Sequence, residues 1–124
     1  MINYTELPQL GSVYLEDSYV LSIAETPGHI AFKLEAVLTP ENPAYHAPRP
    51  GEQYCYADGE LVFSCVESVE WIRRSNNRSV DASGDEDLGN IDSLSFDNGV
   101  FTAEGDWGKV RIHSRSEPAF VLSP

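Results

Sequence analysis

The chain has 124 residues and a mass of 13.7 kDa, a size that fits one domain burying about two thirds of its unfolded surface. Asp and Glu outnumber Lys and Arg by 20 to 8, and the net charge of −12 repels phosphate backbones, so we expect no nucleic-acid partner. No stretch is apolar enough to span a membrane, and residues 1–12 lack the basic and apolar regions of a signal peptide, which predicts a cytoplasmic protein with no membrane partner.

The first half of the chain is predicted to be a meander of strands that follows an N-terminal arm over residues 1–12. Strands are expected over 13–15 and 19–25, separated by a short acidic turn, and Pro27-Gly28 supplies the next turn. The clearest strand is predicted over His29–Thr39, because apolar and polar residues alternate there. Its buried face is expected to hold Ile30, Phe32, Leu34, Ala36 and Leu38.

A proline-rich segment and a hairpin signal come next. Residues 40–52 are predicted to form a tethered surface loop, because each proline removes a donor that a strand ladder needs. Asp58-Gly59 is a two-residue hairpin signal, and a turn there would place Cys55 and Cys65 on opposite faces. We therefore predict two free cysteines, at least one of them a small core residue, as suits a reducing compartment.

The middle of the chain is less regular. The apolar-rich run Leu61–Arg74 favours a strand, although its spacing beyond Val66 also suits a short helix. Residues 75–90 are polar and rich in turn formers, which predicts a long exposed loop.

The clearest hairpin lies in the C-terminal third. Asn98-Gly99 stands between two alternating runs and predicts a type I′ turn that sets Phe96 opposite Phe101. The motif that follows, Gly105-Asp-Trp-Gly108, has the glycines of a phosphate-binding loop. It lacks the Lys-Ser/Thr and the helix that should follow such a loop. We interpret Trp107 as a core residue on the face of the two phenylalanines, with the glycines allowing a bulge or bend.

The remaining apolar segments complete an all-β prediction. A strand is expected to begin near Val110, and Ala119–Leu122 closes the chain as another. About seven to eight short strands, regularly spaced turns and no convincing long helix predict one domain, an antiparallel meander forming a small barrel or sandwich.

No catalytic, cofactor or metal site is predicted. The acidic stretch Asp81–Asp92 offers oxygen ligands for calcium, but its register does not match a helix-loop-helix calcium loop, so we interpret it as an acidic loop. The three histidines are dispersed without the short spacing of a zinc site. The chain has neither a serine between glycines at a strand-helix elbow nor a cysteine with the flanks of a known nucleophile.

Charge is segregated along the chain. Between Ser79 and Gly108 every charged residue is acidic, and Arg73, Arg74 and Arg78 lie just upstream. A surface of one sign attracts a positively charged partner by long-range steering. The candidate partner contacts are Asp85, Glu86, Asp87, Glu104 and Asp106.

Four sequence segments carry a family resemblance: Gly51–Tyr56, Glu70–Ser75, Gly89–Ser93 and Gly105–Ser114. Together they resemble small uncharacterised bacterial β-domain proteins, and the size and acidity are similar to those of immunity proteins of bacterial toxin systems. The resemblance spans most of residues 13–122. It implies a binding role, without a cofactor, in a bacterial cytoplasm.

Three functional hypotheses follow, in order of preference. The first is a non-enzymatic, immunity-like interaction protein that presents the segment Asp81–Asp106 to a basic partner. The second is a small β-barrel that holds an apolar ligand in its interior. The third is an enzyme in which Glu104 and Asp106 share a face with Asp58 or Glu60. An edge strand could also pair two copies, so we expect a monomer or a homodimer.

Overall fold

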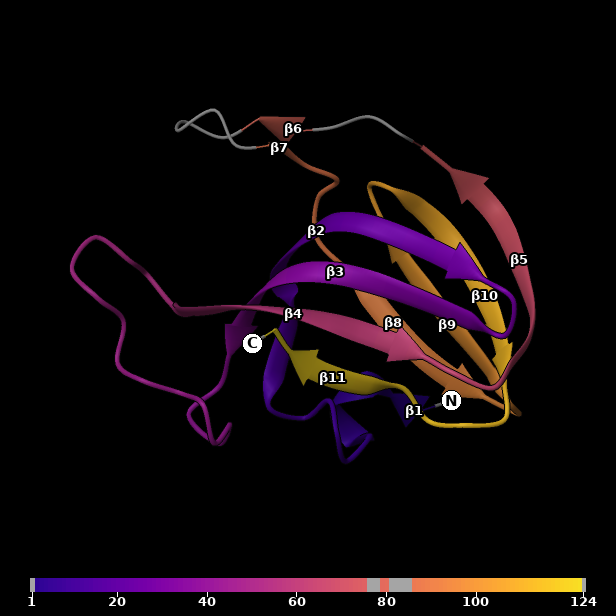
Figure 1. Cartoon of the computed structure of the whole chain (residues 1–124), viewed down its shortest axis with the longest axis horizontal. Helices are drawn as coiled ribbons and strands as arrows, with labels where there is room; N and C mark the ends of the chain where they lie inside the picture. The colour runs from indigo at the N-terminus through magenta and orange to yellow at the C-terminus, as the bar shows by residue number, and fades with distance from the viewer. Residues whose placement is uncertain (1, 76–78, 81–85, 124) are drawn as a thin grey trace.

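The computed structural model describes residues 2–75, 79–80 and 86–123, which fold into antiparallel sheets (Figure 1). In this described part the one helical element is a single 3-10 turn, η1 (Tyr4–Glu6). No helix there has the length and apolar character needed to cross a membrane. The all-β fold class is therefore confirmed.

The strands form two larger sheets and one small one. The first sheet has four strands in the order β11-β4-β3-β2, and the second has five in the order β1-β8-β9-β10-β5. Every neighbouring pair is antiparallel, and β6 pairs with β7 as a separate two-stranded sheet. The strand bounds are β1 (Ile2–Asn3), β2 (Val13–Thr26), β3 (His29–Leu38), β4 (Cys55–Phe63), β5 (Val66–Arg74), β6 (Ser79–Val80), β7 (Glu86–Asp87), β8 (Ser93–Asp97), β9 (Val100–Gly105), β10 (Gly108–Ser114) and β11 (Ala119–Leu122).

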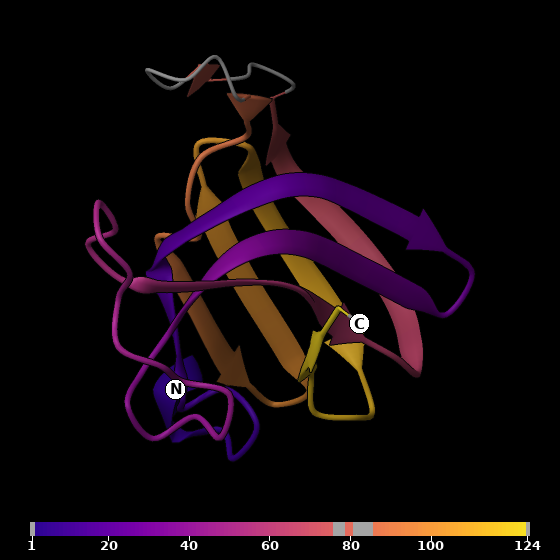
Figure 2. The ribbon, with the colours of Figure 1, turned by 60° about the vertical axis from the view of Figure 1, so that its left-hand side comes forward.

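The two larger sheets face each other across one hydrophobic core (Figure 2). The ring centroid of Phe32, on the four-stranded sheet, lies 5.2 Å from that of Trp107 at the corner between β9 and β10. A second contact joins the sheets between Phe63 and Phe101, whose centroids are 5.5 Å apart. Trp107 is fully buried, at 0% exposure, so its interpretation as a core residue is confirmed.

Two strand predictions with local signals are confirmed. β3 ends one residue before the predicted strand, and the five residues predicted for its inner face are all buried. In the β8–β9 hairpin Phe96 pairs with Phe101 as predicted. Asn98 and Gly99 have φ of 49° and 78°, and two positive values are what a type I′ turn requires.

Of the bulge or bend predicted at 105–108, the structure has a bend, a two-residue turn between β9 and β10. Gly105 pairs with Gly108, and Asp106 and Trp107 form the turn between them. Both glycines are required for space, because an added Cβ would lie 2.2 Å from the Asn90 oxygen at Gly105 and 2.2 Å from the Arg73 oxygen at Gly108. The tight turn brings β10 back beside β9 with its apolar side chains on the core face.

The hairpin predicted at Asp58-Gly59 is wrong. Both residues lie inside β4, where Gly59 pairs with Leu34 on one side and with Leu122 on the other. A Cβ at Gly59 would come within 2.6 Å of the Phe120 ring, so this glycine permits a close approach between strands.

The cysteines are both free, although the predicted hairpin does not separate them. Because β4 is continuous, Cys55 lies on the same core face as Leu61 and Phe63, and it is buried as predicted for at least one cysteine. Cys65 is exposed in the short turn after β4, with a positive φ of 52°.

The two strands predicted over 13–15 and 19–25 are one strand, β2. Its register against β3 shifts between Tyr14 and Tyr19, so the intervening residues form an irregularity and not a turn. Ser18 stabilises this irregularity, because its Oγ donates to the Tyr14 oxygen at 2.6 Å and accepts from the Val37 nitrogen at 2.9 Å.

The run Leu61–Arg74 contains two strands that belong to different sheets. The turn at 64–65 carries the chain from β4 in the four-stranded sheet to β5 in the five-stranded sheet. The strand prediction beyond Val66 is confirmed, and the alternative of a short helix is wrong.

Two segments predicted outside the sheets have mixed outcomes. Residues 40–52 contain no strand or helix, as predicted for the proline-rich loop. The segment 75–90 is not an exposed loop throughout, since it contains β6 and β7 and Leu88 is buried. The N-terminal arm packs onto the domain, with Tyr4, Leu7 and Leu10 all buried.

Candidate functional site

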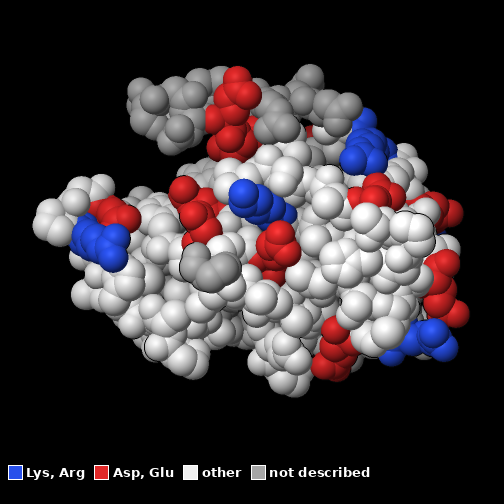
Figure 3. All heavy atoms as spheres, in the orientation of Figure 1, with Lys and Arg blue, Asp and Glu red and all other residues white. Residues whose placement is uncertain are grey.

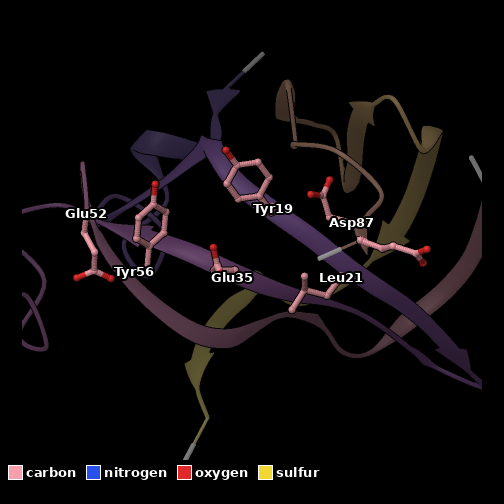
Figure 4. Close-up of a pocket in the computed structure, with 7 residues that line it drawn as sticks. Tyr19, Leu21, Glu35, Glu52, Tyr56 and Asp87 are labelled. Atoms are coloured by element: carbon pink, nitrogen blue, oxygen red, sulfur yellow. The ribbon is translucent and has the colours of Figure 1, made fainter. Parts of the chain in front are cut away.

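The outer face of the four-stranded sheet carries an acidic hollow of about 390 Å³. Figure 4 shows its side chains, with Glu52 and Asp87 on opposite sides of the two tyrosine rings. The lining residues are Tyr19 and Leu21 from β2, Glu35 from β3, Glu52 from the proline-rich loop, Tyr56 from β4, and Glu86 and Asp87 from β7.

Strand pairing brings the first wall together. Tyr19 pairs with Glu35 across β2 and β3, and Glu35 pairs in turn with Asp58 of β4. Directly paired residues point to the same face of a sheet. Tyr56 lies two pairs further along and so on the same face, opposite Val37, and its ring contacts that of Tyr54 edge-to-face with centroids 6.2 Å apart.

The segment after β7 holds the second wall against β2. The Leu88 nitrogen donates to the Val20 oxygen at 2.8 Å, and the Val20 nitrogen donates to the Gly89 oxygen at 2.8 Å. The Asn90 side chain donates to the Ser18 oxygen at 2.7 Å. Asp87 accepts the Gly89 amide at 2.7 Å, which closes the turn that presents its carboxylate to the hollow.

The charge of the hollow is negative. Four of the described lining residues carry a carboxylate, and no Lys or Arg is among the described lining residues. Burial raises the pKa of Tyr56, and the neighbouring Tyr19 and the charges of Glu35 and Glu52 raise it further. Figure 3 shows acidic groups spread over this face of the molecule, with fewer Lys and Arg among them.

The predicted contact residues do not form one surface. Glu86 and Asp87 line the hollow, and Asp85 lies outside the described residues. Asp106 lies beside the turn after β7, since a Cβ added at Gly89 would be 3.1 Å from its Oδ2. Glu86, Asp87 and Asp106 therefore lie at the hollow or beside the segment that supports it.

Glu104 lies elsewhere, on the outer face of the five-stranded sheet. Its carboxylate is 3.3 Å from the Arg73 guanidinium, and it borders a separate hollow with Lys109 and Arg111. The grouping of Glu104 with Asp58 or Glu60 is wrong, because those two residues belong to β4 of the opposite sheet. The acidic segment therefore divides between two faces, and its charge at Glu104 is balanced by nearby cations.

Sequence reasoning missed Tyr19, Glu35, Glu52 and Tyr56. Alternation along β3 places Glu35 on the face opposite the core, but only the sheet order shows that it lies beside Tyr19. Within the part of the chain that the structure describes, no group of three or more His, Cys, Asp or Glu is arranged to hold a metal ion. The hollow thus offers carboxylates and aromatic rings to a ligand.

Such a set of groups is suited to an organic cation. Carboxylates bind guanidinium and ammonium groups through charge-assisted hydrogen bonds, and tyrosine faces attract the same cations. No family model, no curated protein and no solved structure matches this chain.

Proposed function

We propose that this chain is a non-enzymatic, immunity-like interaction protein of the bacterial cytoplasm, and that it binds a basic protein partner through the acidic hollow. The observation that carries the proposal is the convergence of four carboxylates and two tyrosine rings on one concave surface. The partner contributes an arginine or lysine side chain that enters the hollow.

Electrostatics supports this direction of recognition. Four carboxylates around one hollow repel one another, and a bound cation relieves that repulsion. Arginine fits better than lysine, because its planar guanidinium bonds two carboxylate oxygens at once and also stacks on aromatic rings. The net charge of −12 additionally speeds the approach of a basic partner at low ionic strength.

The core argues against an apolar ligand between the sheets. Trp107 and Phe32 fill the space there, with their centroids 5.2 Å apart. We accordingly favour a two-layer sandwich with a filled core over an open barrel. Ligand binding is then expected on the outer surface.

A peptide titration tests the proposal. Calorimetry would compare an oligoarginine peptide, an oligolysine peptide and a neutral Gly-Ser peptide of equal length. We expect affinity in the order arginine, lysine, neutral, with weaker binding at higher salt because exposed charges are screened. Equal affinity for all three peptides, or no binding of the arginine peptide at low salt, would overturn the proposal.

Matched variants separate the hollow from the overall charge. E52Q/E86Q removes two carboxylates from the lining, and E67Q/E117Q removes two exposed carboxylates elsewhere. We expect about a tenfold loss of affinity for the first variant, which corresponds to about 1.4 kcal/mol, and little change for the second. Equal losses would show that net charge alone attracts the peptide.

A further inference from the structure

The free edges of the two larger sheets differ in how they are protected. The edge of β2 is covered where residues 88–89 bond to Val20. The edge of β5 carries two register shifts against β10 and four charged side chains: Glu67, Glu70, Arg73 and Arg74. Bulges and charges of this kind are what keep a strand edge from pairing with another chain. β1, at the remaining edge of the five-stranded sheet, is two residues long.

β11 has none of these protections. Its four residues, Ala119–Leu122, include no charged side chain, and they pair with β4 in continuous register. Val121 is 53% exposed and Leu122 is 40% exposed, which are high values for large apolar side chains. Among the described residues none pairs with the outer edge of β11, since β11 ends its sheet.

We propose that a second copy of this chain pairs with the edge of β11, so that the two four-stranded sheets become one continuous antiparallel sheet. A two-fold axis through Val121 sets Val121 opposite Val121 of the second copy and Phe120 opposite Leu122 of the second copy. In this register, side chains from the same face of the sheet lie opposite each other. Val121 pairs with exposed Glu60 and so lies on the outer face, whereas Phe120 pairs with buried Leu61 and so lies on the core face. The cross-strand pairs at the axis are then all apolar, which stabilises antiparallel pairing.

The charge of the molecule does not prevent this contact. β11 itself is neutral, and the nearest acidic side chains in its sheet, Asp58 and Glu60, lie on β4. Three strand spacings of about 4.8 Å would separate the two β4 strands across the axis, or about 14 Å. That separation exceeds the Debye length of about 8 Å at physiological ionic strength. At about 0.01 M salt the Debye length is about 30 Å, so the two acidic chains repel each other across this distance. Dimerisation is therefore expected to strengthen as salt is raised from that level to physiological ionic strength, whereas binding of the basic partner is expected to weaken.

The contact is small. An edge of four residues buries less than the roughly 1,200 Å² of a standard stable complex. We therefore expect a weak dimer whose population rises with protein concentration.

Sedimentation velocity over a range of protein concentrations tests the proposal. The informative variant is V121K, which sets two lysines opposite each other at the axis. Its matched control is I72K, because Ile72 is 52% exposed on the charged, bulged edge of β5. We expect a concentration-dependent dimer for the native chain and for I72K, and a monomer for V121K. A native chain that stays monomeric at millimolar concentration, or equal effects of the two variants, would overturn the proposal.

Disulfide crosslinking tests the register. In a C65S background, V121C places two thiols opposite each other at the axis, whereas A119C places them four residues apart along the strands. With oxidised glutathione as the electron acceptor, we expect crosslinked dimer from V121C and little from A119C. Equal crosslinking of both variants, or none from V121C while the dimer persists, would contradict the proposed pairing.

Discussion

The indole Nε1 of Trp107 donates a hydrogen bond to the main-chain oxygen of Asn90 at 3.0 Å. This bond joins the corner between β9 and β10 to the segment that follows β7 and holds one wall of the acidic hollow. A residue of the core thus supports the candidate site, although Trp107 is fully buried and does not line it.

Replacing Trp107 by Phe is expected to destabilise the fold. The variant loses the hydrogen bond and leaves a gap beside Phe32, and we expect a loss of about 2–4 kcal/mol in the free energy of unfolding. W71F is the matched comparison, because the Trp71 indole donates to Glu25 at 2.8 Å at an exposed site. Urea denaturation should give a clearly smaller loss in the free energy of unfolding for W71F. Equal losses would argue against a special contribution of the buried Trp107 and its hydrogen bond to stability.

Tyr4 provides a second buried hydrogen-bond centre. Its hydroxyl donates to Glu16 and accepts the Leu15 amide at 3.1 Å, and the side chain is 2% exposed. Y4F leaves the buried Leu15 amide without this partner, which is expected to cost about 1–3 kcal/mol of stability. Urea denaturation at neutral pH measures this loss, and Y14F serves as the control because Tyr14 is exposed.

Tyr4 also makes stability depend on alkaline pH. Burial raises the pKa of Tyr4 above its ordinary value, and the hydrogen bond to Glu16 raises it further. The stability from this neutral hydroxyl is complete below the unfolded pKa of about 10 and is lost as the pH rises toward the higher folded pKa. Between pH 9 and 11 the native chain should lose stability more steeply than Y4F. Parallel pH profiles would contradict this assignment.

Local chemistry made some elements predictable from the sequence. The hairpin at Asn98-Gly99 is predictable together with its Phe96–Phe101 pair, because an Asn-Gly pair between two alternating runs favours a type I′ turn, which fixes the register of the two strands. β3 was predicted because a strand with one buried face must alternate.

Predictions failed where a residue's role depends on distant neighbours. Asp58-Gly59 has the sequence of a two-residue turn, but position 59 requires a glycine for another reason. Phe120, near the end of the chain, packs against it and leaves no space for a Cβ. The hollow escaped prediction for the same reason. Tyr19, Glu35 and Tyr56 come from three strands, and only the order β4-β3-β2 places them together.

Gly59→Ala tests the corrected interpretation of that glycine. The added methyl group would lie 2.6 Å from the Phe120 ring and 2.7 Å from the Val121 oxygen, so β11 must shift. We expect a loss of about 1–3 kcal/mol in the free energy of unfolding, as overpacking usually costs. Faster amide exchange in β11 should accompany the loss. Unchanged stability and exchange would mean that the two strands do not approach this closely.

Tyr56 tests whether an aromatic face contributes to cation binding in the hollow. Y56F keeps the ring and removes the hydroxyl, whereas Y56A removes both, so the two variants separate the ring from the hydroxyl. A cation over a partly exposed ring gains about 0.5–1 kcal/mol, so Y56A should bind oligoarginine about two- to fivefold more weakly. Y56F should bind like the native chain, as should Y14A, since Tyr14 lies on β2 outside the lining. Equal losses for Y56F and Y56A would assign the contact to the hydroxyl, and native affinity for Y56A would remove the ring from the site.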